Sequence, residues 1–168
     1  MHSTAGEIRI VHLPGAALHA LAEGDLTAAI ALSPVAPSAY LAGPECRGLW
    51  RMRDAQVAQD PASAGWVTGI VWDESRGRAV GAAGFHAPPD RSGMVEIGYR
   101  IDPHQRRQGY ARAALEALLA RGSPGTPRPA GTGQHPTRQP GVIATGAAVR
   151  LQPGRRAVGR RGRAGTRL

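Results

Sequence analysis

The chain has 168 residues, one cysteine, no lysine and a formal net charge of +9. This length suits a single domain with one core. A lone cysteine excludes an internal disulfide, and the lack of lysine excludes a P-loop and Schiff-base chemistry on a lysine. No basic and then apolar N-terminal segment stands out, and acidic residues interrupt the longest apolar stretch. We therefore expect a cytoplasmic protein without a membrane span.

The positive charge belongs to the C-terminal part of the chain. Residues 1–120 contain 11 Arg and 12 acidic residues, whereas the residues from Arg121 onward contain 10 Arg and no acidic residue. Residues 122–168 also contain 10 Gly, 6 Pro and no aromatic residue. Apolar side chains are too sparse there to offset the entropy of ordering the chain. The sequence therefore predicts a domain over 1–121 and a disordered basic tail over 122–168.

The first half of the domain begins with a strand and continues with helices. Ile8–His12 alternates as a strand does. Apolar residues at helical spacing between Ala16 and Leu32 predict a helix that Gly24 can split. A proline-containing loop leads to a second helix over Cys46–Gln59, in which Cys46 is expected to be a small buried hydrophobe.

The second half predicts three strands and then a helix. The strands are expected over Trp66–Trp72, Val80–His86 and Met94–Ile101, and the helix over Arg107–Ala120. Aromatic residues on these strands could line a pocket, but such residues are more often part of the core; they are Trp66, Trp72, Phe85 and Tyr99. His86 and His104 lack metal-ligand spacing and are expected at the surface or in turns.

The segment from Ile101 to Ala111 suits a phosphate group. The first N–H groups of a helix have no partner within the helix, and the helix dipole adds partial positive charge beside them. Gly109 would let a ligand approach the main chain. Arg106 and Arg107 add fixed positive charge. The alternative is an ordinary helix start with solvated arginines.

Arg106-x-x-Gly109-x-Ala111 matches the R/Q-x-x-G-x-G/A signature of the GNAT superfamily of acyl-CoA-dependent N-acetyltransferases. A V-E-I-G-Y strand precedes it and a regular helix follows, so residues 66–120 resemble the core of that family. The resemblance implies an α/β fold with a mixed, mostly antiparallel sheet flanked by helices. It also implies acetyl-CoA as co-substrate, no metal, and direct transfer of an acetyl group to a primary amine of a small molecule or a protein.

The same resemblance implies a cofactor site in this segment. The backbone of Ile101, Asp102 and Pro103 would face the pantetheine arm, which in the family lies between two parallel strands that splay apart. The pyrophosphate would be held by the N–H groups of the turn, with Arg106 beside it; the residues concerned are Arg107, Gln108, Gly109, Tyr110 and Ala111.

Glu96 is the candidate catalytic residue. A base must take a proton from the amine before or during attack on the thioester, and a carboxylate on a mostly apolar strand suits that role. The alternative is a half-exposed glutamate paired with an arginine such as Arg100. The family's general acid is often a tyrosine on a later helix, and no tyrosine lies beyond Tyr110.

The tail does not provide the two strands and the helix with which a domain of this family continues. Codons permitted by Gln134–Arg167, when read one base out of frame, allow a segment similar to the family's C-terminal end. We therefore expect that a frame slip near Gly122 replaced the C-terminal strands with the basic tail. The competing hypothesis is a non-catalytic module whose tail binds nucleic acid, as Arg/Gly segments do.

Overall fold

The structure is a computed structural model that describes residues 5–88, 91, 95–122, 140–145 and 148–153. Its helices are α1 (Gly15–Glu23), α2 (Leu26–Leu32), α3 (Pro44–Gln59) and α4 (Tyr110–Gly122), with 3-10 turns at Pro61–Gly65 and Pro103–Gln105. Its strands are β1 (Ile8–Val11), β2 (Gly69–Asp73), β3 (Arg78–Phe85), β4 (Val95–Ile101), β5 (Pro140–Thr145) and β6 (Ala148–Pro153).

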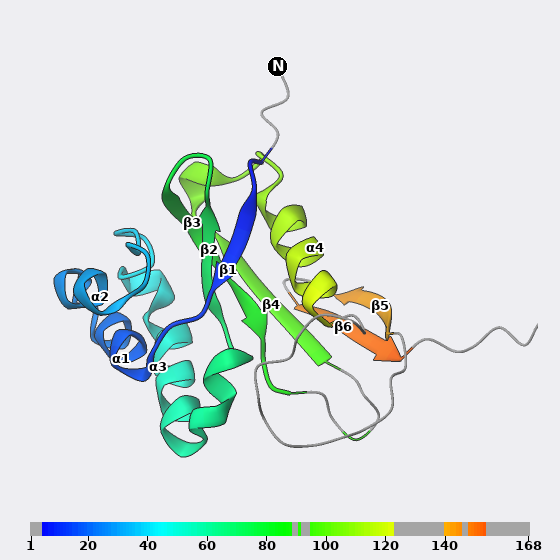
Figure 1. Cartoon of the computed structure of the whole chain (residues 1–168), viewed down its shortest axis with the longest axis horizontal. Coiled ribbons are helices and arrows are strands. Elements are labelled where there is room, and N and C mark those ends of the chain that lie inside the picture. The colour runs from blue at the N-terminus through cyan, green and yellow to red at the C-terminus, as the bar shows by residue number, and fades with distance from the viewer. Residues whose placement is uncertain (1–4, 89–90, 92–94, 123–139, 146–147, 154–168) are drawn as a thin grey trace, which may run out of the picture.

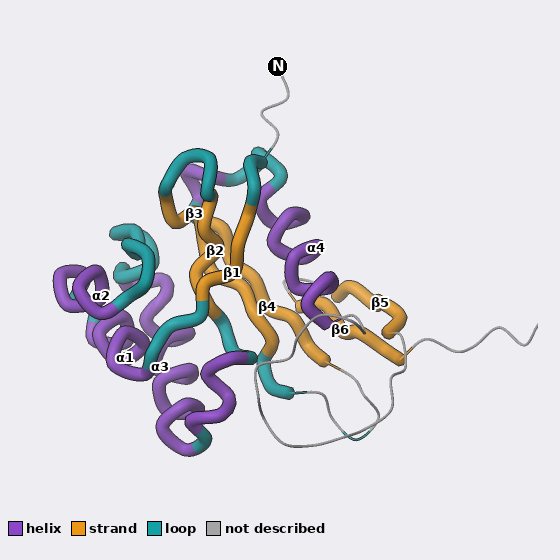
Figure 2. Tube along the Cα trace, in the orientation of Figure 1, coloured by secondary structure: helices purple, strands orange, loops and turns teal. Residues whose placement is uncertain are grey.

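The strands form one sheet in the order β1-β2-β3-β4-β6-β5. All the described strand pairs are antiparallel. Helices α1–α3 cover one face of the sheet and α4 lies on the other, as Figure 1 shows. Figure 2 shows how the loop after β4 leads directly into α4.

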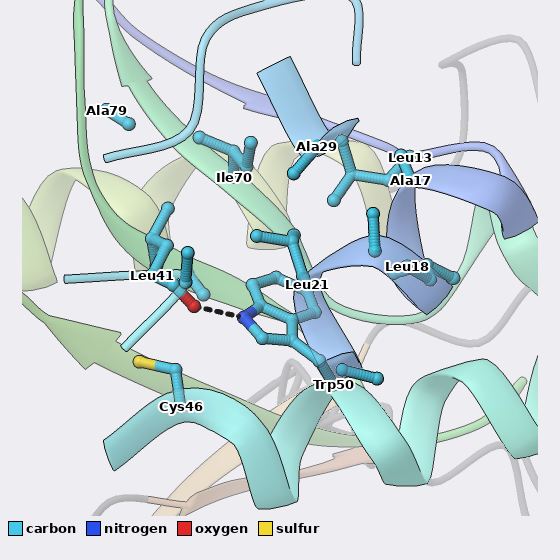
Figure 3. Close-up of a cluster of buried hydrophobic side chains, with 14 of the residues drawn as sticks. Leu13, Ala17, Leu18, Leu21, Ala29, Leu41, Cys46, Trp50, Ile70 and Ala79 are labelled. Atoms are coloured by element: carbon cyan, nitrogen blue, oxygen red, sulfur yellow. Dashed lines mark hydrogen bonds between the residues drawn. The ribbon is translucent and has the colours of Figure 1, made fainter. Parts of the chain in front are cut away.

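Two apolar clusters hold these layers together. One joins α1–α3 to the sheet, and at its centre the buried Trp50 ring donates a hydrogen bond of 2.8 Å from Nε1 to the carbonyl of Leu41 (Figure 3). The other packs Tyr110, Ala114 and Leu118 of α4 against the opposite face. Burial of this kind stabilises by roughly 25 cal/mol per Å² of apolar surface, so each helix is held mainly by its buried face.

A β-bulge in β3 decides which side chains face α3. Val71 pairs with Gly81 and Trp72 pairs with Ala79, so Val80 is the extra residue. A bulge shifts the alternation of side chains beyond it. Val80 accordingly belongs to the cluster under α4, whereas Ala82, two residues later, belongs to the cluster under α1–α3.

The α/β class and the antiparallel character predicted from the sequence are confirmed. Gly24, with a φ of 74°, separates α1 from α2 as expected. The buried position of Cys46 is also confirmed.

Three expectations differ from the structure. Residues 66–68 precede β2 instead of belonging to it, because the 3-10 turn at Pro61–Gly65 ends directly before Trp66. Helix α4 begins at Tyr110, three residues after the expected start at Arg107, since Arg107 and Gly109 have φ values of 61° and 85° that no α-helix contains.

The third difference concerns residues 122–168, where no strand was expected. The structure describes β5 and β6 there, and β6 pairs with β4. Both segments contain short runs of β-branched and apolar residues, such as Val142-Ile143, that suffice for a strand in a sheet. The remainder of the expected disordered tail, 123–139, 146–147 and 154–168, lies outside the described residues.

Candidate acyl-donor cleft

The turn between β4 and α4 is shaped by Asp102 and two positive φ angles. The Asp102 carboxylate accepts a hydrogen bond of 2.9 Å from the N–H of His104, and the Asp102 N–H donates to the carbonyl of Val80 over 2.9 Å. The chain then passes through the left-handed conformation at Arg107 and Gly109 before α4 begins. Turns with left-handed residues form concavities of backbone N–H groups that bind anions.

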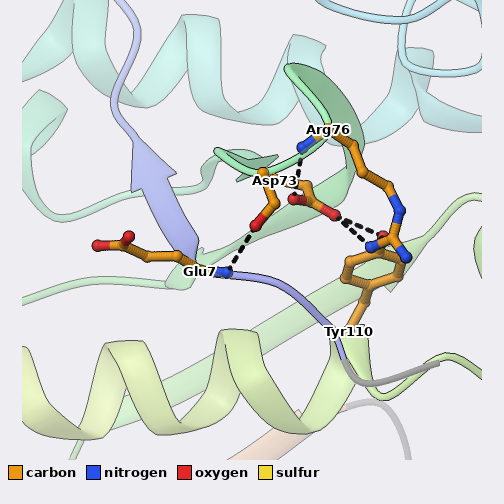
Figure 4. Close-up of polar contacts among 5 residues, drawn as sticks. Glu7, Asp73, Arg76 and Tyr110 are labelled. Atoms are coloured by element: carbon orange, nitrogen blue, oxygen red, sulfur yellow. Dashed lines mark hydrogen bonds and ion pairs between the residues drawn. The ribbon is translucent and has the colours of Figure 1, made fainter. Parts of the chain in front are cut away.

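A buried polar contact fixes the start of α4 (Figure 4). The Tyr110 hydroxyl donates a hydrogen bond of 2.6 Å to Oδ2 of Asp73, and a guanidinium nitrogen of Arg76 lies 2.9 Å from the same oxygen. Asp73 is fully buried at the end of β2. Burial would raise the pKa of Asp73, but the hydrogen bonds from Tyr110 and Arg76 outweigh that effect and lower it. Asp73 is therefore a buried carboxylate that holds the first residue of α4 against the sheet.

A cleft of about 820 Å³ opens beside this turn. Its described lining includes four arginines and one carboxylate, together with Tyr40, Tyr99, Ile101, Gln105, Gly109, Tyr110 and Ala111; the charged residues are Arg100, Arg106, Arg107, Arg112 and Glu45. Arg112 is paired with Glu116 at 2.8 Å on the surface of α4. The excess of arginines suits an anionic ligand with several phosphate groups.

Gly109 keeps the main chain accessible from the cleft. A Cβ placed there would meet nothing closer than Ala5, 3.8 Å away, so the space beside its backbone is open. The positive φ of Gly109 is the stronger reason for a glycine, because other residues adopt it at a cost of about 1–3 kcal/mol.

The edge of β4 is open along part of the cleft. Strand β6 pairs with Val95–Gly98 and its register stops there. Tyr99, Arg100 and Ile101 line the cleft and have no strand beside them on that edge within the described residues. The parallel neighbour of β4 that the resemblance implied is not found in the described part, since β6 runs antiparallel.

The structure brings most of the predicted cofactor residues to the cleft. Six line it, namely Ile101, Arg106, Arg107, Gly109, Tyr110 and Ala111. Asp102, Pro103 and Gln108 are outside the described lining. The Ile101 carbonyl already accepts a hydrogen bond of 3.2 Å from Arg106. The N–H of Asp102 is bonded to the carbonyl of Val80 and is not free for a pantetheine arm, whereas the Ile101 carbonyl keeps a second lone pair.

Glu96 is outside the described lining of the cleft. It is half-exposed on β4, and its Oε1 lies 3.5 Å from Nδ1 of His86. The partner of Glu96 is thus His86, and not Arg100, which was the arginine named in the alternative interpretation. Arg100 instead donates a hydrogen bond to the carbonyl of Glu45 in the first turn of α3. His86 directly follows β3, as a turn residue should, but its side chain belongs to a cross-strand pair.

Tyr40 and Glu45 are cleft residues that the sequence did not reveal. They lie some sixty residues before the signature, and nothing in their neighbourhood indicates a site. Burial raises the pKa of the Tyr40 hydroxyl and of the nearby Cys46 thiol, so both groups remain protonated near neutral pH. Of the four aromatic residues that the sequence placed on strands, Tyr99 lines the cleft, while Phe85 is buried in the core.

The arrangement described so far defines an α/β protein with an arginine-rich cleft at a strand-to-helix turn. A family model for the GNAT acetyltransferase domain matches residues 18–130. The chain therefore belongs to the GNAT acetyltransferase family. It is also 30% identical over 63 residues to an uncharacterized N-acetyltransferase, YjdG, of Bacillus subtilis (strain 168). That match covers 38% of this chain and 38% of the relative, and no significant match to a solved structure was found.

Among the described residues, no three His, Cys, Asp or Glu side chains come together as a metal site. In the same part of the chain, no helix is long and apolar enough to cross a membrane.

Proposed function

We propose that this protein transfers an acetyl group from acetyl-CoA to a primary amine. The observation that carries the proposal is the cleft itself, where four arginines surround a turn whose backbone is accessible at Gly109. Membership of the GNAT acetyltransferase family supports acetyl transfer.

In this proposal the pyrophosphate of acetyl-CoA binds at the turn before α4. The N–H groups at the start of α4 point along the helix axis without partners in the helix, and the dipole favours negative charge there. Arg106 and Arg107 flank this position on the cleft wall. The unpaired edge of β4 from Tyr99 to Ile101 then offers main-chain groups to the amide-containing arm of the same molecule.

The Glu96 carboxylate promotes the removal of a proton from the acceptor amine in this proposal. An ammonium ion has no lone pair, so the acceptor nitrogen must be neutral when it attacks the thioester carbonyl. A base in the active site commonly contributes a factor of about 100 to 10,000 to such a reaction. The acceptor itself is either a small molecule or an amino group of a protein.

A thiol-release assay tests the proposal directly. The full chain is incubated with acetyl-CoA and a panel of small primary amines and amino-terminal peptides, and free CoA thiol is measured. We expect thiol release that depends on at least one acceptor. Calorimetry with acetyl-CoA alone should show binding, and absence of both signals would contradict the proposal.

The ten arginines without an acidic residue from Arg121 onward favour a second candidate, a nucleic-acid-binding module. Each neutralised phosphate releases counterions, so such binding weakens steeply as salt is raised. Salt-sensitive binding of single-stranded RNA or DNA without thiol release would support this module over the enzyme.

We also propose that residues 1–121 are the acetyltransferase domain and that 122–168 are read out of frame. The absence of aromatic and acidic residues after Arg121 supports this division. Sequencing the gene across the codon of Gly122 tests it.

A further inference from the structure

We propose that His86, oriented by Glu96, is the group that takes the proton from the amine acceptor. This inference rests on the proposed function and assigns the chemical step within it to a particular pair. Glu96 then acts through His86 as a positioning residue.

The side chains of His86 and Glu96 form a close pair. Nδ1 of His86 faces Oε1 of Glu96 at 3.5 Å, and the two residues are joined by a backbone hydrogen bond of 2.8 Å from the His86 N–H to the Glu96 carbonyl. A carboxylate beside Nδ1 favours the tautomer with the proton on Nδ1. Nε2 is then left with a free lone pair that can accept a proton.

Nε2 of the same ring lies over β4. A Cβ on Gly98 would lie only 2.5 Å from Nε2 of His86, so the imidazole covers the Cα of Gly98. Gly98 and Arg100 are on the same face of β4, about 7 Å apart along the strand. Arg100 lines the acyl-donor cleft. Nε2 therefore lies over Gly98 of β4. The next residue on the same face of the strand is the cleft residue Arg100.

The backbone of His86 is held by two side chains of α3. Gln56 of α3 donates a hydrogen bond of 2.9 Å to the His86 carbonyl, and Arg53 donates a longer one of 3.4 Å. Arg53 is 3% exposed and also donates to Thr68 over 3.0 Å. A residue held by its N–H and by its carbonyl retains little freedom, which is what a proton-transfer group requires.

Both side chains of the pair are accessible to solvent. The side chains of His86 and Glu96 are 39% and 38% exposed, so an amine can reach them from solvent. Among the described residues, the charged groups near this pair include Arg100 from β4 and Arg53 and Glu45 from α3. Glu96 is the charged group beside Nδ1 of the imidazole.

The proposed acetyl transfer conserves atoms and electrons. The lone pair of the amine nitrogen forms the new C–N bond to the acetyl carbonyl carbon, while an N–H proton of that nitrogen moves to Nε2 of His86. The C–S bond breaks and its electron pair stays on sulfur. The proton on the imidazole passes through solvent to the thiolate, so the products are an N-acetyl amine and free CoA thiol.

The test compares His86→Gln with His19→Gln in the full chain. His19 is a matched control, because its Nδ1 lies 2.9 Å from a carboxylate oxygen of Asp54 on the surface of α1 and α3. We expect His86→Gln to lower kcat by about 100-fold or more, to leave acetyl-CoA affinity by calorimetry unchanged, and to flatten the rise of kcat/KM with pH. His19→Gln should leave all three unchanged. A kcat for His86→Gln within twofold of wild type would overturn the inference.

A measurement without turnover keeps the test independent of the enzyme assay. Long-range proton–nitrogen correlation spectra of the nitrogen-15-labelled chain report which ring nitrogen of each histidine carries the proton, and the His86 signals are those missing from His86→Gln. We expect Nδ1–H in the neutral wild-type ring and a shift toward Nε2–H in Glu96→Ala. A neutral ring with Nε2–H in wild type would overturn the inference even if thiol release is observed. If wild type releases no thiol with any amine, the proposed function itself fails.

Discussion

The hydroxyl of Tyr110 donates a hydrogen bond of 2.6 Å to the buried carboxylate of Asp73, joining the first residue of α4 to the end of β2. This contact links residues that are 37 positions apart in the chain. Because α4 begins at the turn that borders the cleft, the same contact determines where the helix N-terminus lies relative to the sheet.

Tyr110→Phe should therefore destabilise the fold by about 1.5–3 kcal/mol, since it removes a hydrogen bond to a charged and fully buried group. Urea unfolding measures the change. Tyr40→Phe is the control, because the Tyr40 hydroxyl is near the Cys46 thiol and not on a carboxylate. The free energy of unfolding of this variant should fall by less than about 1.5 kcal/mol. Equal losses in the two variants would contradict the role assigned to Asp73.

The stability of the protein should fall as the pH is lowered from 6.5 to 4. Burial, aided by the positive charge of Arg121, lowers the pKa of His12 from its ordinary value of 6.5 to about 4. In this range the unfolded chain binds a proton on His12 and the folded chain does not, so the contribution is fully present above pH 6.5 and lost toward pH 4. The loss should approach about 3 kcal/mol.

His12→Gln tests this prediction, since glutamine stays neutral and can still accept the hydrogen bond from Arg121. Urea unfolding of both proteins at several pH values should show a flatter curve for His12→Gln between pH 4 and 6.5. Parallel curves would show that another group causes the pH dependence.

Gly109→Glu should abolish measurable acetyl-CoA binding, because the added carboxylate would lie where we propose that the pyrophosphate binds. Gly77→Glu provides a matched control. Gly77 is a second glycine with a positive φ, 59°, and a Cβ there would meet nothing within 4 Å. Both variants should lose a similar 1–3 kcal/mol or so of stability from backbone strain. Calorimetry should show that only Gly109→Glu loses affinity, and retained affinity would show that the turn does not hold the pyrophosphate.

Replacing residues 122–168 by the shifted-frame sequence should raise solubility, thermal stability and turnover together. The present chain leaves the β4 edge from Tyr99 to Ile101 without a neighbouring strand in the described part, and such edges promote aggregation. Thermal unfolding, light scattering and thiol release measure the three effects. A replaced chain that behaves no better than the present one would end the frame-slip proposal.

Local patterns in the sequence determined most of the elements and the nature of the turn before α4. The alternation in Ile8–His12 and the break at Gly24 depend on residues that are neighbours in the chain, so they can be recognised without the fold. Gly109 and the two arginines before it, Arg106 and Arg107, can likewise be recognised from residues that are close together in the chain. The start of α4 was predicted three residues early, because helical spacing does not reveal that Arg107 adopts a positive φ.

Only the tertiary structure decided which side chains meet. The pair of His86 and Glu96 depends on strand register and on the bulge at Val80, which moves the residues after it to the opposite face of the sheet. Tyr40, from the loop before α3, lines the cleft, and Asp73 reaches Tyr110 through the packing of α4. Such contacts join segments that are distant in the chain. Their partners are selected by register and by the burial of whole faces, and a local sequence pattern encodes neither.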